Sequence, residues 1–226
     1  MTHLSIVIPV LNEAENIQTA LRRLQNLRRR GHEVIVVDGG SSDQTSLLAA
    51  DLADRILSAP CGRALQMNRG AAASNGEILL FLHADTELPT DCDRLIAQAL
   101  ADKCGWGRFD IRLSGHHPLF RVIAACINWR SRISGIATGD QAIFVSRALF
   151  EQAGGFPAIP LMEDIALSRR LRDYRRPHCL SARAVTSSRR WERHGILKTV
   201  ILMWWLRFRY FFGADPDKLA RIYRQS

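Results

Sequence analysis

The stretches Leu4-Ser-Ile-Val-Ile-Pro-Val-Leu-Asn-Glu13 and Glu33-Val-Ile-Val-Val-Asp-Gly-Gly-Ser-Ser-Asp43 decide the fold. Each begins with a short apolar run rich in Ile and Val and continues into a polar loop. Such runs are typical of strands that are buried on both faces of a sheet. We therefore expect one strand over residues 4–8, ended by Pro9, and a second strand over residues 33–37.

Helical segments separate the expected strands. Between the first two, apolar residues recur at helical spacing until Gly31, which predicts a helix over residues 13–30. Toward the C-terminus the same reasoning predicts a helix, a strand, a helix and a strand at residues 43–53, 55–58, 62–74 and 78–82. This alternation indicates an α/β fold with a mostly parallel central sheet flanked by helices. The alternation fades after residue 105, where we expect strands and helices that complete the site.

Three polar loops are expected at one edge of this sheet. They are Pro9-Val-Leu-Asn-Glu13, Asp38-Gly-Gly-Ser-Ser42 and His83-Ala84-Asp85, and each follows a predicted strand. In open parallel sheets the ligand crevice lies beyond the carboxyl ends of the strands, so the loops should converge there. The chain contains neither a G-x-G-x-x-G after the first strand nor a G-x-x-x-x-G-K-[ST]. This argues against a dinucleotide-binding Rossmann domain and a P-loop nucleotide hydrolase.

Length and composition fit one globular domain. The chain has 226 residues, of which 47% are hydrophobic and 23% charged, close to globular averages. Its cysteines lack C-x-x-C spacing, which favours free thiols in a reducing cytosol; they are Cys61, Cys92, Cys104, Cys126 and Cys179. The N-terminus lacks a signal-peptide pattern, and no apolar run approaches the ~20 residues that span a bilayer. We expect a cytoplasmic protein that is not integral to the membrane.

Positive charge is concentrated near the C-terminus. Residues 169–226 contain 15 Lys/Arg and 4 Asp/Glu, a net charge of +11, whereas residues 1–168 carry −2 and the whole chain carries +9. This stretch is also rich in Trp, Tyr and Phe, a composition that suits phosphates, anionic lipid head groups or nucleic acid. No recognisable nucleic-acid motif accompanies the charge, so we expect no nucleic-acid partner.

The segment Ile196–Phe212 has no clean amphipathic stripe. On a helix, Lys198 and Arg209 would lie on one face and Arg207 on the opposite face. A helix in the head-group region of a membrane is one interpretation. Burial against the domain or against a dimer partner is the other.

The order of motifs resembles family 2 glycosyltransferases of GT-A fold. That family's early and late motifs are matched, in order, by Ser5–Glu13, Val36–Asp43, the strand ending in Asp85, Gly139–Gln141, Met162–Asp164 and Arg189–His194. The segments Phe-Leu-His-Ala-Asp-Thr and Thr-Gly-Asp-Gln-Ala most resemble the corresponding motifs of the small group of glycosyltransferases associated with radical-SAM and selenodomain proteins. The resemblance covers roughly residues 4–195. It implies a single Rossmann-like GT-A domain over residues 1–195 and a helical tail over residues 196–226.

The resemblance places a nucleotide-diphosphate sugar against the first polar loops. It implies that Asp38 accepts a hydrogen bond from the nucleobase, as an acceptor-only carboxylate can. Further contacts to the donor are implied for Pro9, Asn12, Glu13, Arg63, Asn68, Ala84 and Asp85. Helix capping is the alternative for Asp38, Asn12 and Glu13. A solvated helix face is the alternative for Arg63 and Asn68.

His83-Ala84-Asp85 stands where the family has D-x-D. On extended backbone, positions i and i+2 point the same way, so both side chains can approach one ion. The resemblance implies Mn²⁺ or Mg²⁺, held by Asp85 and bridging the donor diphosphate. His83 replaces the first Asp, which biases the site toward Mn²⁺ or alters a ribose contact. His194 is implied to complete the metal shell, with a surface histidine as the alternative.

Glu163 and Asp164 precede an apolar-periodic stretch and are therefore expected in the first turn of a helix. Asp164 matches the family's catalytic base, with Glu163 beside it. One base suffices, because it takes the proton from the acceptor hydroxyl as that oxygen attacks the anomeric carbon. The alternative is that acidic residues favour a helix N-terminus through the helix dipole.

The late motifs imply contacts to the sugar and the diphosphate. Gly139-Asp140-Gln141 predicts a tight loop whose backbone approaches the donor sugar or the acceptor, because Gly needs no side-chain clearance. Arg190 is implied to contact the diphosphate, and Trp191 to stack on a sugar.

Together these features imply an inverting, metal-dependent glycosyltransferase with a UDP-linked donor. The acceptor is unknown; the basic, aromatic tail favours a lipid-linked acceptor and peripheral contact at the inner membrane face. A sugar-phosphate nucleotidyltransferase is an alternative, although the loop after the first strand lacks the Gly-rich, basic character that holds a triphosphate. A nucleotide-sugar-binding or membrane-surface adaptor, inactive through His83, is another.

Overall fold

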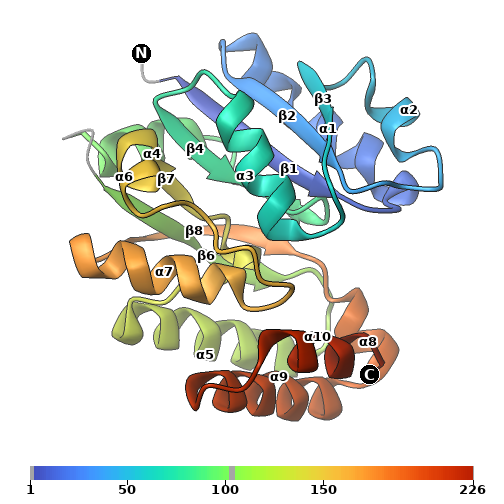
Figure 1. Ribbon diagram of the computed structural model, residues 1–226, viewed down its shortest axis with the longest axis vertical. Helices are drawn as coiled ribbons and strands as arrows, with labels where there is room; N and C mark the ends of the chain where they lie inside the picture. The colour runs from blue at the N-terminus through green and yellow to red at the C-terminus, as the bar shows by residue number, and fades with distance from the viewer. Residues whose placement is uncertain (1–2, 102–104, 226) are drawn as a thin grey trace.

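One eight-stranded sheet organises the part of the chain that the computed structural model describes, residues 3–101 and 105–225 (Figure 1). The strand order is β3-β2-β1-β4-β7-β6-β8-β5. The first four strands pair in parallel; they are β1 (Leu4–Val10), β2 (Glu33–Asp38), β3 (Arg55–Ser58) and β4 (Ile78–Phe81). The predicted α/β fold, with a central sheet that begins with parallel strands, is confirmed.

The second half of the sheet is mixed. The strand β7 (Phe144–Ser146) runs antiparallel to both β4 and β6 (Trp106–Leu113). The strand β8 (His178–Thr186) is parallel to β6, and the short β5 (Thr86–Glu87) is antiparallel to β8. Strands of two or three residues, such as β5 and β7, are too short to show a hydrophobic period in the sequence. For this reason the alternation of predicted strands and helices fades after residue 105.

The first strand is longer than predicted, because it continues through Pro9 to Val10. The carbonyl of Val7 accepts a hydrogen bond from Leu82 beside β4, and the carbonyl of Val10 accepts one from Gly39 beside β2. Alternation then turns the nitrogen of Pro9 toward the β4 side, at a point that β4 does not reach. The missing N–H of proline therefore removes no ladder hydrogen bond.

Helices cover both faces of the sheet (Figure 1). One core contains the buried face of α1 (Ala14–Arg29) and side chains of α4 (Cys92–Ala99). The other contains side chains of α3 (Arg63–Ala73), α6 (Arg147–Gln152) and α7 (Glu163–Tyr174). The predicted helices at 13–30 and 62–74 are confirmed.

The helix predicted at 43–53 is shorter, since α2 covers only Thr45–Ala49. The carboxylate of Asp43 accepts hydrogen bonds from the backbone and hydroxyl of Thr45, so Asp43 caps the helix from outside it.

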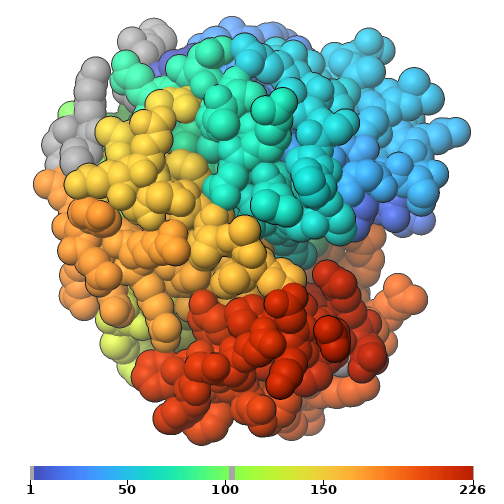
Figure 2. All heavy atoms as spheres, viewed as in Figure 1, coloured from blue at the N-terminus to red at the C-terminus, as the bar shows by residue number. Residues whose placement is uncertain are grey.

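The C-terminal segment forms α8 (Arg189–His194), α9 (Ile196–Phe211) and α10 (Pro216–Gln225), beside the long α5 (Pro118–Ser134). Leu206 and Leu219 pack with Met162 and Ile165 in a third core cluster. The tail is therefore partly buried against the domain, and it forms the lower part of the molecule in Figure 2. No helix in residues 3–101 and 105–225 is long and apolar enough to cross a membrane.

Four cysteines, Cys61, Cys92, Cys126 and Cys179, are free thiols. Cys104 lies outside the described residues.

Candidate functional site

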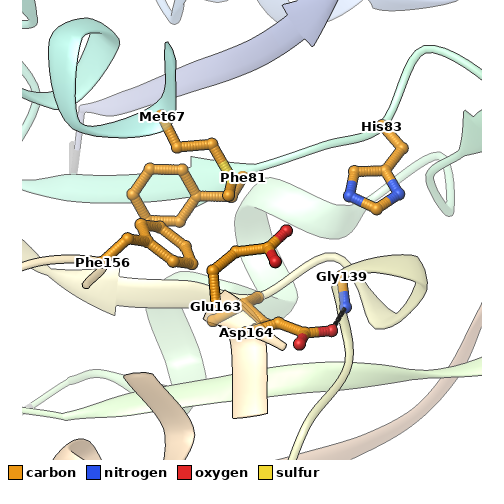
Figure 3. Close-up of a pocket in the computed structure, with 8 residues that line it drawn as sticks. Met67, Phe81, His83, Gly139, Phe156, Glu163 and Asp164 are labelled. Carbon is orange, nitrogen blue, oxygen red and sulfur yellow. Dashed lines mark hydrogen bonds between the residues drawn. The ribbon is translucent and has the colours of Figure 1, made fainter. Parts of the chain in front are cut away.

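A small cavity lies at the carboxyl edge of the parallel strands, where the sequence predicts the site (Figure 3). Its walls come from α3, from the end of β4, from the 3₁₀ turn η1 (Gly139–Gln141) and from the first turn of α7. Glu163 extends toward the cavity between an apolar wall on one side and His83 on the other. The lining residues are Met67, Phe81, His83, Gly139, Ile143, Phe156, Glu163 and Asp164.

Asp164 is held by two backbone amides. Its Oδ2 accepts a hydrogen bond of 2.8 Å from Gly139, and its Oδ1 accepts one of 2.7 Å from Ile165. The chain enters α7 at Met162 with φ 68°, a left-handed conformation that is uncommon for a residue other than glycine. The carboxylate of Asp164 is thus fixed in orientation beside the cavity.

Glu163 is buried and has a changed affinity for protons. Burial and the neighbouring charge of Asp164 raise the pKa of Glu163 to about 7, and the positive charge of Arg63 opposes this rise. Two adjacent carboxyl groups therefore have different environments, which is typical of sites that handle protons.

Arg63 gathers the acidic residues of the cavity. Partial loss of hydration opposes the charge of its guanidinium, but Glu163, Asp164 and Asp85, together with nearby Tyr223, raise the pKa of Arg63 above its usual value. Charges act strongly only over short distances. Arg63, Asp85, Glu163 and Asp164 thus share one region of the molecule; the side chain of Arg63 is exposed there, and its contact with the donor remains a prediction.

His83 packs against η1. A Cβ built on Gly139 would lie 2.6 Å from both Cε1 and Nε2 of the His83 ring, so only glycine fits there. Gly139 therefore lies close to His83, and the predicted approach of its backbone to the donor sugar or the acceptor remains a prediction. Burial, together with the positive charge of Arg63, lowers the pKa of His83 to about 3, which keeps the imidazole neutral.

The residues after β4 can hold a divalent cation only with help from a ligand. Within the described residues, no group of three His, Cys, Asp or Glu side chains is arranged around a common point. Asp85 is exposed, and its carboxylate accepts only a long 3.4 Å hydrogen bond from Thr86. One carboxylate and a neutral imidazole suit Mn²⁺ or Mg²⁺ if donor phosphate oxygens fill the remaining positions.

Asp38 organises the second loop. Its Oδ1 accepts hydrogen bonds from the backbone and hydroxyl of Ser41, and its Oδ2 accepts one from the hydroxyl of Ser46. Burial opposes the charge of Asp38, but these hydrogen bonds prevail and lower its pKa. Asp38 therefore holds the loop before α2, and a contact with a nucleobase remains a prediction.

Asn12 and Glu13 join the first loop to the second. The Oδ1 of Asn12 accepts hydrogen bonds from the backbone and hydroxyl of Ser42, and the backbone amide of Asn12 donates one to the hydroxyl of Ser41. The Glu13 amide donates to the hydroxyl of Thr45. The hydrogen bonds of Asn12 and Glu13 therefore fix two of the three predicted loops against each other. Pro9 lies just before the first of these loops.

Asn68 links α3 to the segment that precedes α7. Its amide donates to the carbonyl of Phe156 and accepts from the Phe156 amide. Phe156 in turn packs edge-on against Phe81, with ring centroids 4.8 Å apart. Asn68 thus positions the apolar wall of the cavity, a role that the sequence did not indicate.

Residues of α8 do not line the cavity. Arg190 stacks on the ring of Tyr223 at 3.8 Å and donates a hydrogen bond to the Tyr223 carbonyl. Trp191 is half-buried, and His194 is exposed at the end of the helix. Their predicted contacts with diphosphate, sugar and metal remain predictions, and those of Arg190 require it to leave α10.

Two arginines lie near the site but are not among the site residues predicted from the sequence. Arg130 on α5 and Arg207 on α9 both experience the negative charges of Asp140 and Asp164. The only sequence signal was the placement of Arg207 on the helix face opposite Lys198 and Arg209. The half-buried Asp140 also has a raised pKa, because desolvation and the charge of Asp164 outweigh its hydrogen bond with Thr138 and the nearby arginines.

Curated relatives match less than half of the chain. Glycosyltransferase AglE of Haloferax volcanii is 38% identical over 90 residues, which cover 36% of this chain and 30% of the relative. An undecaprenyl-phosphate 4-deoxy-4-formamido-L-arabinose transferase of an Enterobacter species is 30% identical over 107 residues, which cover 42% and 33%. The matched segment thus spans about a third of the length of these relatives.

Solved structures share the fold over most of the chain. S. aureus TarS 1-349 in complex with UDP-GlcNAc has a TM-score of 0.66 at 18% identity, covering 83% of this chain and 58% of that chain. The mannosyltransferase PcManGT of Pyrobaculum calidifontis, in complex with GDP-Man and Mn²⁺, has a TM-score of 0.58 at 23% identity, covering 80% and 56%. Residues 5–135 match the profile of the glycosyl transferase family 2. With this match over more than half of its length, on the fold and loops described above, the chain belongs to glycosyl transferase family 2.

Proposed function

We propose that this protein is an inverting glycosyltransferase that moves a sugar from a UDP-linked donor to an acceptor hydroxyl. The observation that carries the proposal is the shared environment of Arg63, Asp85, Glu163 and Asp164 at the carboxyl edge of the parallel strands. In this environment the guanidinium of Arg63 can bind phosphate, and the neighbouring carboxylates can transfer protons. Membership of the radical-SAM- and selenodomain-associated group stays a prediction from two short sequence motifs.

The donor is expected to bind along the first three loops. Asp38 would read the nucleobase, with Pro9, Asn12 and Glu13 beside the nucleoside and Ala84 and Asp85 near the diphosphate. Arg63 supports this direction, because a guanidinium suits phosphate oxygens in geometry and charge. Its exposed side chain lies beside the carboxylates that need a positive partner when no phosphate is bound.

The transfer is a single displacement. The acceptor oxygen forms a bond to the anomeric carbon, and the bond from that carbon to the diphosphate oxygen breaks with its electron pair leaving on the nucleotide. Asp164 takes the proton of the acceptor hydroxyl. The hydrogen bonds from Gly139 and Ile165 support this role, because they fix the carboxylate before the acceptor arrives. A base on one face and a leaving group on the other give inversion.

The chemistry of the residues after β4 supports a bound Mn²⁺ or Mg²⁺. Asp85 and the neutral ring of His83 would hold the ion, with His194 as a further predicted ligand. Such an ion, when bound, neutralises negative charge on the departing diphosphate. Glu163, protonated in part near neutral pH, limits the negative charge that the donor diphosphate meets in the cavity.

The tail is proposed to contact the membrane surface, with a lipid-linked acceptor reaching the site from there. The exposed face of α9 is apolar and aromatic, and α5 also exposes Trp129 and Ile133; on α9 the exposed residues are Leu197, Ile201, Trp204, Trp205, Phe208 and Phe211. Basic residues flank this face, as in helices that lie in the head-group region. The apolar face with flanking basic residues, together with free cysteines, supports a location at the cytoplasmic face of the membrane. In this proposal residues 196–226 form a tail that contacts the membrane, and residues 1–195 form the glycosyltransferase domain.

Membrane contact can be tested with vesicles of phosphatidylcholine and phosphatidylglycerol. Trp204→Glu combined with Phe208→Glu is expected to abolish sedimentation with the vesicles. Leu47→Glu, which alters an exposed apolar residue on α2, is the matched control and should sediment as the wild type does. Equal sedimentation of all three proteins would contradict membrane contact through α9.

Transfer can be tested by screening nucleotide sugars for thermal stabilisation with and without Mn²⁺, since a bound ligand raises stability by mass action. The stabilising donor is then incubated with acceptors, and nucleotide release is measured. We expect stabilisation by a UDP-sugar and release of UDP. Binding without release on any acceptor would favour the adaptor alternative, and pyrophosphate release from UTP with a sugar phosphate would favour the nucleotidyltransferase.

A further inference from the structure

Two arginines from distant parts of the chain lie close enough to Asp164 and Asp140 to experience their negative charges. Arg130 belongs to α5 and Arg207 to α9, and these helices run side by side in Figure 1. Burial and the positive charge of Arg207 lower the pKa of Arg130 to about 10, while Asp140 and Asp164 oppose that change. The two guanidinium groups are therefore close enough to repel each other.

The pair has unused hydrogen-bond donors. The Nε and Nη2 atoms of Arg130 are buried and donate no hydrogen bond within residues 3–101 and 105–225, and Nη1 reaches only the carbonyl of Ile136 at 3.5 Å. Arg207 makes neither a hydrogen bond nor an ion pair with any other described residue; burial lowers its pKa, with Asp164 and Asp140 opposing. The buried donors of Arg130 are costly without partners, and an anion shared with Arg207 offsets both the repulsion and the lost hydrogen bonds.

The nearby carboxylates do not complete the pair. Asp164 is occupied by the amides of Gly139 and Ile165. Asp140 keeps one buried oxygen without a partner, so no hydrogen bond joins that oxygen to either guanidinium. Two arginines that present planar, parallel donors are the side chains that proteins use most for phosphate.

Asp164 interacts with two groups of charges. One contains Arg63, Asp85 and Glu163. The other contains Arg130, Arg207 and Asp140. A base that takes a proton from the acceptor must lie beside the acceptor, so arginines close to Asp164 also lie close to the acceptor.

We propose that Arg130 and Arg207 form a binding site for a phosphate group carried by the acceptor, which delivers the acceptor hydroxyl to Asp164. The inference rests on the proposed function, because it assigns an acceptor side to the same cavity. The phosphate can belong to a soluble phosphorylated acceptor or to a lipid head group; the apolar exposed face of α9 next to Arg207 accommodates the second source.

The test is a calorimetric titration with inorganic phosphate in the presence of saturating UDP and Mn²⁺, so that the donor site is already filled. Arg207→Gln is compared with the wild type and with Arg209→Gln, which alters an exposed arginine on the same helix. We expect at least tenfold weaker phosphate binding for Arg207→Gln, partial recovery in Arg207→Lys, and no change in Arg209→Gln. Arg130→Gln should show the same loss as Arg207→Gln.

Phosphate affinity that is equal in the wild type and in both glutamine variants would overturn the proposal. UDP binding is measured first in every protein and should be unchanged, which separates the two hypotheses. If the wild type bound no nucleotide or nucleotide sugar, the proposed function would fail, whatever phosphate does.

A second arm identifies the source of the phosphate. Phosphatidylcholine vesicles with and without phosphatidic acid are added as competitors of inorganic phosphate. Competition only by vesicles with phosphatidic acid, lost in Arg207→Gln, supports a lipid phosphate. Retained binding of inorganic phosphate in the presence of both vesicles supports a soluble phosphorylated acceptor.

Discussion

The backbone amide of Gly139 donates a hydrogen bond of 2.8 Å to the Oδ2 of Asp164 (Figure 3). This contact ties η1 to the first turn of α7, two segments that are 25 residues apart in the chain. Because Gly139 also packs against His83, one glycine connects the proposed base with the proposed metal-binding segment. The two halves of the reaction therefore depend on the same loop.

Asp164→Asn should stop transfer and spare donor binding. The amide keeps the size of the side chain but cannot take a proton, so the rate should fall on the order of 10²–10⁴-fold. UDP release in the presence of acceptor measures the rate, and calorimetry measures the affinity for UDP-sugar. Asp173→Asn alters an exposed carboxylate on the same helix and should leave both unchanged. Turnover of Asp164→Asn at the wild-type rate would show that another group is the base.

Glu163→Gln should stabilise the protein at high pH. Burial and Asp164 raise the pKa of Glu163 from 4.5 to about 7, so the folded state binds more protons than the unfolded state between these values. The carboxyl group therefore makes the free energy of unfolding fall as the pH rises through this range. At pH 8 the variant should be more stable by about 3 kcal/mol, and the difference should vanish below about pH 4.5. Urea unfolding at several pH values measures it; a difference independent of pH would contradict the raised pKa.

Gly139→Ala should weaken Mn²⁺-dependent donor binding. A Cβ at this position would lie 2.6 Å from the His83 ring, so the ring must move, and we expect roughly tenfold weaker binding. In a His83→Ala background the same change should have little further effect, because its steric partner is gone. Additive losses in the double variant would show that Gly139 acts by another route.

Tyr223→Ala should strengthen binding of the donor. The ring of Tyr223 holds the guanidinium of Arg190 at 3.8 Å, and a cation–π contact of this kind is worth about 0.5–2 kcal/mol. If Arg190 binds the diphosphate, its release should lower the dissociation constant of UDP several-fold. Adding Arg190→Gln should remove the gain. A gain that persists in the double variant would assign the effect to α10 itself and not to Arg190.

The sequence allowed the first half of the fold to be predicted because its strands are continuous apolar runs. Val7 and Val37 are buried within such runs, and the loops that follow them converge as expected. The mixed second half could not be predicted, since Phe144–Ser146 and Thr86–Glu87 are too short to show a period.

The candidate site was predictable only where one local motif supplies a group. Glu163 and Asp164 follow from their place before a helix, and Asp85 from its place after a strand. Arg130 and Arg207 come together only through the packing of α5 against α9. No local pattern in either helix records that contact. For the same reason the hydrogen bonds of Asn68 with Phe156, which span 88 residues, could not be foreseen.

A calorimetric titration of the wild-type protein with UDP-sugars, with Mn²⁺, with Mg²⁺ and without either ion, decides whether the protein binds a nucleotide-sugar donor. We expect saturable binding of a UDP-sugar that is strengthened by the cation, and loss of that strengthening in Asp85→Asn. Absence of any nucleotide-sugar binding in all three conditions would contradict this expectation.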